Sequence, residues 1–251
     1  MALFRETWKR DFSFRARTLK SSPIVLLMAA AGRGVRLGRS ESKAWTKLCG
    51  KPLLWHAFQN AFQVKEIELI ITIVPPGEAA SATAAINKWG APIGIKIIEG
   101  GEKRQDSVRK AVEALPENCK IVVVHDAARI FASRTLFSKV IEAARRSGAA
   151  VPAVGPTDTV VQLDRCSDLI YLDRSALRLI QTPQAFRADV LKEAHKKAVQ
   201  DGIEGTDDAS LVKMLGRKVE VVEGEVSNFK ITYPEDLQRA ELIISSKNVN
   251  R

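Results

Sequence analysis

The chain has 251 residues, of which 45% are hydrophobic and 27% are charged, as is ordinary for a globular protein that buries a core. No stretch reaches the roughly 20 consecutive apolar residues of a membrane-spanning helix, so no membrane partner is expected. The formal net charge of +10 suits an anionic ligand. Zinc-finger spacing, an RNA-binding aromatic signature and a basic stripe interleaved with aromatics are all lacking, so nucleic acid is not expected as a partner.

Residues 1–22 are interpreted as an N-terminal extension. The first twenty residues hold six Lys/Arg, two Asp/Glu and no clean hydrophobic period. Targeting peptides are Arg-rich but usually poor in acidic residues, so Glu6 and Asp11 argue against one. The three cysteines are scattered without metal-ligand spacing, so we interpret them as reduced thiols and expect a cytoplasmic protein.

Beyond this extension, short apolar runs alternate with segments of helical period. The expected strands are residues 24–28, 69–74, 93–98, 121–125 and 149–154. Helical apolar faces follow at 53–62, 108–115 and 136–144, with Pro52 at the start of the first and Ser133 as N-cap of the third. This alternation predicts an α/β fold with a Rossmann-like, mostly parallel sheet and helices on both faces.

The alternation breaks near residue 156. The segment "TDTVVQLDRCSDLIYLD" (157–173) reads as two strands around a polar turn, without a crossover helix. Such an excursion suits contact with a partner subunit, so we expect a β-arm for dimerisation at about 156–175. Helical patterns return at 188–200, 207–215 and 234–244, with a strand at 219–222. No linker interrupts the pattern, so a single domain is expected over residues 23–246.

The stretch "AAAGRGVRLGRSESKAWTKLCGKPLL" (29–54) follows the first expected strand. It is no P-loop, because no Gly-Lys-Ser/Thr follows, and it lacks the third glycine of a dinucleotide fingerprint after Gly32 and Gly34. Ligands of parallel sheets bind beyond the carboxyl ends of the strands, where this stretch lies. Backbone N–H groups of a glycine loop cradle phosphates, and Arg36 and Lys43 could neutralise their charge. The stretch therefore indicates a phosphate-bearing ligand.

Seven further segments come in a recognisable order after this loop. They are "GGEKRQDSV" (100–108), "VVVHDAAR" (122–129), "TDTV" (157–160), "LDR" (172–174), "QTPQAF" (181–186), "TDDASLV" (206–212) and "SNFKITYPEDL" (227–237). Together with the loop they resemble the 2-C-methyl-D-erythritol 4-phosphate cytidylyltransferases of the nucleotidyltransferase superfamily, over about residues 24–244. The resemblance implies transfer of the cytidylyl group of CTP to methylerythritol phosphate, with release of pyrophosphate, in non-mevalonate isoprenoid precursor biosynthesis.

The resemblance also assigns roles to single residues. Because the substrate phosphate is the nucleophile, the protein needs positive charge and positioning rather than a nucleophile of its own. Arg36 and Lys43 would bind the CTP phosphates, and Lys230 would lie beside the transferred α-phosphate as the third catalytic residue. The implied CTP-binding residues are Ala30, Gly32, Gly34, Gly101, Glu102, Ser107 and Asp126. Asp126 is also the implied ligand of Mg²⁺ or another divalent cation.

Two residues in these segments have a structural alternative. Ser107 could be a helix N-cap, since an apolar helical face follows it, and one hydroxyl could do both. His125 is interpreted as a structural residue rather than an acid or base.

The implied sugar-phosphate site consists of Arg129, Thr159, Arg174 and Thr182. Thr159 and Arg174 fall on the expected arm. In the family this arm reaches into the neighbouring subunit's site, so the resemblance implies a homodimer.

Two departures from the family pattern affect these assignments. The family usually has Pro-Lys-Gln, an aromatic residue and Leu where this chain has "SKAWT", so Lys47 competes with Lys43 for the assignment. "DAAR" is usually followed by Pro and here by Ile130, which would loosen the turn that carries Arg129.

Three other functions remain open on sequence alone. The nearest is cytidylyl transfer to ribitol 5-phosphate by a relative of the same fold. Another is a catalytically inactive binding protein on that fold, and the third is nucleic-acid binding, which only the charge suggests.

Overall fold

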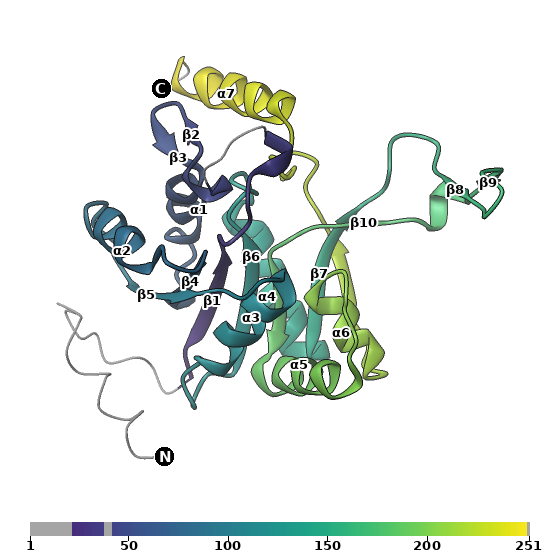
Figure 1. Cartoon of the computed structure of the whole chain (residues 1–251), viewed down its shortest axis with the longest axis horizontal. Coiled ribbons are helices and arrows are strands. Elements are labelled where there is room, and N and C mark those ends of the chain that lie inside the picture. Colours follow the sequence, from purple (N-terminus) through teal and green to yellow (C-terminus); the bar gives the residue numbers. More distant parts are fainter. Residues whose placement is uncertain (1–21, 38–41, 250–251) are drawn as a thin grey trace.

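A computed structural model describes residues 22–37 and 42–249, so most of the expected N-terminal extension lies outside the described residues. The centre of the molecule is an eight-stranded sheet in the order β10-β7-β11-β6-β1-β4-β5, with β12 beside β7 (Figure 1). Its strands are β1 (Ile24–Ala29), β4 (Ile67–Val74), β5 (Gly94–Glu99), β6 (Ile121–Asp126), β7 (Ala149–Val154), β10 (Leu179–Ile180), β11 (Gln184–Arg187) and β12 (Glu220–Glu223). Strand β1 pairs in parallel with β4 and β6, β4 with β5, and β7 with β12, whereas β10 and β11 are antiparallel to their neighbours. The predicted α/β fold with a mostly parallel sheet is confirmed.

Helices cover both faces of the sheet, as expected. They are α1 (Leu53–Ala61), α2 (Ala79–Asn87), α3 (Arg104–Glu113), α4 (Arg134–Ser147), α5 (Ala188–Asp201), α6 (Asp208–Met214) and α7 (Pro234–Val249). Leu26 and Met28 of β1 face a core that includes residues of α1 and α4, while Val25 and Leu27 face a second core with residues of α3, α5 and α6. Alternate residues of a strand point to opposite faces, so an uninterrupted apolar run fits a strand that is buried on both sides.

Local signals in the sequence fix several helix ends. Pro52 is the N-cap of α1, and its fixed φ suits entry into a helix. The Ser133 hydroxyl accepts a hydrogen bond from the Leu136 N–H at 3.0 Å and so caps α4, as predicted. Ser107 lies inside α3, whose N-cap is Lys103, so the N-cap alternative for Ser107 is wrong.

The expected arm is present as an excursion from the body. Strands β8 (Val161–Leu163) and β9 (Leu169–Tyr171) form an antiparallel pair of their own, apart from the central sheet. In Figure 1 this pair projects well away from the sheet and its helices. A second small pair, β2 (Lys47–Leu48) with β3 (Lys51–Pro52), lies between the glycine loop and α1. No helix within the described ranges has the length and apolar character needed to cross a membrane.

Candidate active site

A cleft of about 110 Å³ opens beyond the carboxyl ends of β1 and β6. Its lining comes from four segments: the loop after β1, the start of α3, the end of β6 with the turn after it, and the segment before α7. The lining residues are Ala29, Ala30, Ala31, Gly32, Lys43, Ala44, Arg104, Asp126, Ala127, Ala128 and Lys230. The fold therefore brings together residues as distant in the sequence as Ala29 and Lys230, at the edge where a parallel sheet binds its ligands.

Backbone hydrogen bonds hold the described part of the loop after β1. The Ala30 N–H donates to the Ile73 carbonyl at 2.9 Å, and the Lys43 N–H donates to the Gly32 carbonyl at 3.1 Å. A Cβ added at Gly32 would meet nothing within 4 Å, so the cleft is open on this side of the chain. Gly34 is buried and its carbonyl accepts from the Leu37 N–H in a short helical turn. The loop leaves room for a ligand close to its backbone.

The structure distinguishes Lys43 from its competitor Lys47. Lys43 lines the cleft, whereas Lys47 is exposed on β2 and is not among the lining residues. The residues after Lys43 hold its loop in place, because the Trp45 indole N–H donates to the Glu78 carboxylate at 3.0 Å. The departure of "SKAWT" from the family pattern therefore leaves Lys43 at the cleft.

Positive charge is concentrated around Lys43. Burial, together with the charges of Lys230 and Arg36, lowers the pKa of the Lys43 ammonium to about 8. The Arg36 guanidinium is exposed and lies over the Tyr233 ring, 5.8 Å from its centroid. These positive charges repel one another in the free protein, and a bound polyanion would relieve the repulsion. The cluster is therefore a preformed site for a polyanion.

Asp126 is the acidic centre of the cleft. Its Oδ2 accepts a hydrogen bond from Lys230 Nζ at 2.6 Å, and Arg104 Nε lies 3.8 Å from its Oδ1. Burial alone would raise the pKa of this carboxyl, but the charges of Lys230 and Arg104 outweigh burial and hold the pKa well below its usual range. Asp126 is therefore an ionised carboxylate although it is only 8% exposed.

His125, beside Asp126, is built into the fold. Its Nε2 donates to the Arg129 carbonyl at 3.1 Å, and its Nδ1 lies 3.0 Å from the Thr182 hydroxyl. Burial lowers the pKa of His125 to about 4, so the ring is neutral near pH 7. This placement agrees with the interpretation of His125 as structural.

The loop before α3 is tightly closed. The Ser107 hydroxyl accepts from the Gly101 N–H at 3.0 Å and donates to the Lys103 carbonyl at 3.0 Å. A Cβ at Gly101 would come within 2.5 Å of the Asp106 Cβ, so this position has no room for a side chain. Glu102 is exposed on the same loop. The loop presents a fixed set of backbone groups near the cleft.

The four residues expected at the sugar phosphate lie in different places. Thr182 is buried, and its hydroxyl accepts from the Asp126 N–H at 3.0 Å. The Arg129 guanidinium donates to the Asn228 carbonyl at 2.7 Å, in the segment that carries Lys230. The turn before Arg129 is closed by its N–H donating to the Asp126 carbonyl at 2.9 Å, despite the missing proline.

Thr159 and Arg174 are exposed on the arm and do not line the cleft of their own chain. Arg174 Nη1 donates to the Thr157 carbonyl at 2.9 Å. Within one chain, then, the structure does not bring these two residues to Lys43 and Asp126.

Sequence reasoning missed one charged residue of the cleft lining. Arg104 lines the cleft between Asp126 and Asp208, and its Nη2 lies 2.8 Å from Asp208 Oδ2. It stands inside the quoted segment "GGEKRQDSV", but nothing in that segment alone shows which of its charged residues faces the cleft.

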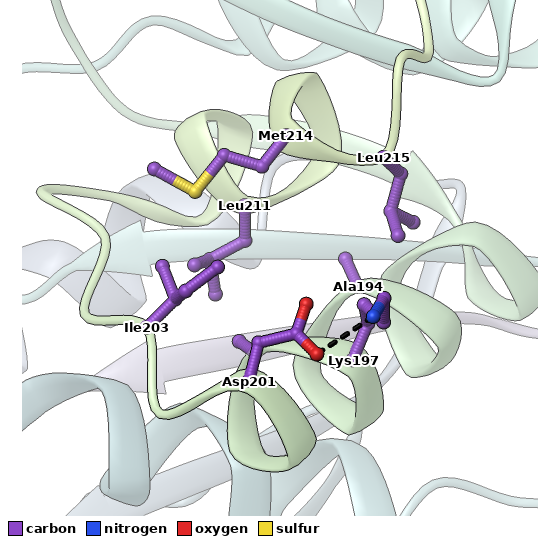
Figure 2. Close-up of a pocket in the computed structure, with 8 residues that line it drawn as sticks. Ala194, Lys197, Asp201, Ile203, Leu211, Met214 and Leu215 are labelled. Atoms are coloured by element: carbon purple, nitrogen blue, oxygen red, sulfur yellow. Dashed lines mark hydrogen bonds and ion pairs between the residues drawn. The ribbon is translucent and has the colours of Figure 1, made fainter.

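A smaller depression of about 40 Å³ lies between α5 and α6 (Figure 2). Ala194, Leu211, Met214 and Leu215 give it an apolar lining, and one ion pair, Lys197–Asp201 at 2.6 Å, crosses its rim. None of the residues predicted for the active site lies there.

Comparison with known proteins gives consistent matches over nearly the whole described chain. The family model for 2-C-methyl-D-erythritol 4-phosphate cytidylyltransferase matches residues 24–246. A protein of that name from Syntrophus aciditrophicus is 41% identical over 226 residues, which cover 89% of this chain and 97% of that protein. One from Pelotomaculum thermopropionicum is 40% identical, with coverage of 89% and 95%.

Solved structures agree with these sequence matches. The crystal structure of 4-diphosphocytidyl-2C-methyl-D-erythritol synthase from Anaerococcus prevotii has a TM-score of 0.79 at 30% identity, covering 90% of this chain and 99% of its own. That of 2-C-methyl-D-erythritol 4-phosphate cytidylyltransferase from Thermus thermophilus has a TM-score of 0.72 at 38% identity, with coverage of 88% and 98%.

Proposed function

The chain belongs to the 2-C-methyl-D-erythritol 4-phosphate cytidylyltransferase family, and from this premise we propose how its cleft carries out the reaction. It is a nucleotidyltransferase that transfers the cytidylyl group of CTP to methylerythritol phosphate, in isoprenoid precursor biosynthesis. The observation that carries the proposal is the convergence of Lys43, Lys230 and Asp126 on one cleft.

The positively charged side chains of the cleft stabilise negative charge that develops during the transfer. A phosphate oxygen of the substrate forms a bond to the α-phosphorus of CTP, and the bond to the leaving pyrophosphate breaks. Negative charge builds on the α-phosphate oxygens and on the departing group. We assign Lys43 and Arg36 to the triphosphate and Lys230 to the α-phosphate, where preorganised cations stabilise the transition state more than the ground state.

The loop of residues 100–107 is proposed to read the base. Cytosine offers an amino donor beside ring-nitrogen and carbonyl acceptors. The N–H groups of Ala30 and Gly101 are already bonded, to the Ile73 carbonyl and the Ser107 hydroxyl, so we assign the cytosine contacts to the remaining backbone groups at Ala30, Gly101 and Glu102. The tight packing at Gly101 supports this role, because a fixed backbone discriminates between bases better than a mobile one.

A divalent cation, Mg²⁺ for preference, fits the donor set at Asp126. Mg²⁺ binds through one or two carboxylates together with substrate phosphates and water. The Asp126 carboxylate is ionised, and Arg104 Nε, at 3.8 Å from Oδ1, is too distant for a hydrogen bond to that oxygen. No group of three or more His, Cys, Asp and Glu residues that could hold a metal alone occurs among the described residues, so the phosphates would supply the remaining ligands. When bound, the cation would neutralise phosphate charge.

The choice of sugar phosphate provides the first test. Purified protein should release pyrophosphate from CTP with methylerythritol 4-phosphate, and not at comparable rates from ATP, GTP or UTP. A methyl group in a fitted pocket is worth about 1–3 kcal/mol, so we expect methylerythritol phosphate to be preferred over ribitol 5-phosphate in kcat/KM by at least ~10-fold. Use of ribitol phosphate equal to or better than that of methylerythritol phosphate would reverse the assignment of the substrate.

Removal of divalent cations tests the proposed metal. EDTA should stop turnover and added Mg²⁺ should restore it.

The arm supports a homodimer. Its strands expose large apolar side chains, among them Leu163 (61% exposed), Leu169 (49%) and Tyr171 (71%). A two-stranded pair is marginally stable alone, and such apolar exposure is typical of a surface that a partner covers. A second copy would also supply what one chain lacks at its cleft, since Thr159 and Arg174 lie on the arm. We propose that they bind the sugar phosphate in the partner's site.

Subunit mixing tests this proposal. Arg174→Ala and Lys43→Ala should each be nearly inactive alone. After subunit exchange, half of the dimers are mixed and each contains one site with both residues intact, so about a quarter of wild-type activity should return. Mass spectrometry would verify the exchange. Verified exchange without recovered activity would contradict action across the dimer.

Lys43 should also couple CTP binding to proton uptake. Its pKa of about 8 in the free protein leaves a large neutral fraction above pH 8, and a bound polyanion favours the ammonium form and raises the pKa. Binding should therefore take up protons at pH 8.5 and almost none at pH 7, and CTP affinity should fall as pH rises through this range. Calorimetry in buffers of different ionisation enthalpy measures the uptake. Lys43→Arg stays charged and should abolish it, whereas uptake that persists in this variant would assign the proton elsewhere.

A further inference from the structure

The base-reading loop is tied to the connection between α5 and α6 by three consecutive residues. Lys103 pairs with Glu204 at 2.6 Å, and Arg104 pairs with Asp208 at 2.8 Å. The Gln105 side chain exchanges hydrogen bonds with the backbone of residues 203–205, at 3.0 and 2.9 Å. The start of α3 is thus attached to a segment about a hundred residues later in the chain.

Asp208 differs from Glu204, the other acidic partner in these contacts, because Asp208 is buried and Glu204 is exposed. Asp208 is 1% exposed, and its second oxygen accepts a hydrogen bond from His195 Nε2 at 3.1 Å. His195 is 2% exposed and belongs to α5. Figure 2 shows residues of α5 and α6 facing one another. Burial would raise the pKa of Asp208, but the hydrogen bond from His195 and the charge of Arg104 outweigh burial and lower it. Asp208 is a fixed, ionised acceptor for Arg104.

Arg104 stands between two carboxylates. On one side Asp208 holds its Nη2 at 2.8 Å, and on the other Asp126 lies 3.8 Å from its Nε. Its side chain is 34% exposed and lines the cleft. Since Asp208 makes the shorter contact, it draws the guanidinium away from Asp126, whose Oδ2 is bound by Lys230. Without Asp208, the nearest carboxylate for Arg104 would be the one at the centre of the cleft.

We propose that Asp208, held by His195, is a positioning residue for cytidylyl transfer: it fixes the Arg104 guanidinium and, through it, the base-reading loop of residues 100–107. The proposal rests on the function assigned to the cleft above. It predicts that loss of Asp208 lets Arg104 pair with Asp126, displaces the loop and weakens CTP binding and base selection. Asp208 acts only through Arg104, since the two are in direct contact and Asp208 does not line the cleft.

The test is a double-mutant cycle of Asp208→Asn and Arg104→Gln, read by the KM for CTP, the binding of CTP and the preference for CTP over UTP. A hydrogen bond to a charged group is worth about 1.5–3 kcal/mol, so Asp208→Asn should raise the KM for CTP about 10- to 100-fold. The base preference should shrink, and kcat at saturating substrates should change less than KM. Because Asp208 acts through Arg104, the double variant should be no worse than Arg104→Gln alone. His195→Gln should raise the KM for CTP and reduce the base preference by smaller factors than Asp208→Asn does.

Glu204→Gln is the matched control. It removes an exposed ion pair between the same two segments, and exposed pairs contribute little, so its KM and base preference should equal those of the wild type. Thermal unfolding of every variant separates a general loss of stability from the CTP effect. If Asp208→Asn does not fold, Arg104→Gln, which leaves the buried Asp208–His195 pair in place, must still raise the KM for CTP and reduce base preference.

Additive effects in the cycle, or wild-type KM and base preference in Arg104→Gln, would overturn the proposal. A wild-type protein that fails to turn over CTP with methylerythritol phosphate would instead contradict the proposed function. The two failures are therefore distinguishable.

Discussion

Replacing Lys43 by Ala should lower kcat about 10²- to 10³-fold, which corresponds to roughly 3–4 kcal/mol of lost transition-state stabilisation. Lys43 lines the cleft, and burial with the charges of Lys230 and Arg36 lowers its pKa, so its ammonium stands to gain from a bound polyanion. Its removal leaves the triphosphate charge partly uncompensated in a partly buried site. Steady-state release of pyrophosphate measures the effect.

Lys47→Ala is the matched control for this experiment. Lys47 is four residues later, is exposed on β2 and is absent from the lining of the cleft, so its loss should change kcat little. Lys43→Arg should retain more activity than Lys43→Ala, because it keeps the charge. Near-wild-type turnover by Lys43→Ala, or an equal loss in Lys47→Ala, would remove Lys43 from the catalytic residues.

The sheet could be predicted because its signals are local. The buried strands β1, β4 and β6 are mostly apolar, and α1 and α4 show a clear apolar face, so hydrophobic period and capping residues are sufficient to predict them. Helix α2 was missed because its sequence is rich in small residues and buries only Ala82 and Ile86. Strand β11 was missed because its four residues belong to the sheet only through insertion between β6 and β7, which no local pattern specifies.

The residues of the site also fall into those that a local sequence pattern predicts and those that depend on contacts between distant segments. The glycine loop and Lys43 stand out in the sequence, because glycines and cations beyond a strand end are a local pattern. The contact between Arg104 and Asp208 joins residues 104 positions apart and depends on how α3 meets α6. The sugar-phosphate residues on the arm differ, because no pattern in one chain specifies which cleft they serve. Thr159 and Arg174 do not line the cleft of their own chain, and the proposed second copy would place them at its partner's cleft.

Lys230→Ala should be the other severe variant, with kcat/KM reduced about 10²- to 10³-fold. The substitution removes a cation from the cleft and also leaves Asp126, only 8% exposed, without its 2.6 Å partner. A loss of activity in this variant alone is therefore ambiguous. It could arise from the missing charge at the α-phosphate, or from an unpaired carboxylate that disturbs the site.

The double variant Lys230→Met with Asp126→Asn separates the two causes. Both charges are then absent, so no unpaired carboxylate remains. The free energy of unfolding should recover relative to Lys230→Ala, because removing both partners of this part-buried pair should cost less than leaving the buried Asp126 carboxylate alone. If Lys230 served only as the counter-ion of Asp126, activity would rise to that of Asp126→Asn alone. We expect stability to recover while kcat/KM stays at or below that of Lys230→Ala, because the α-phosphate still lacks its cation. Urea unfolding and pyrophosphate release on the same samples give both quantities, and a parallel recovery of the two would make Lys230 a structural residue.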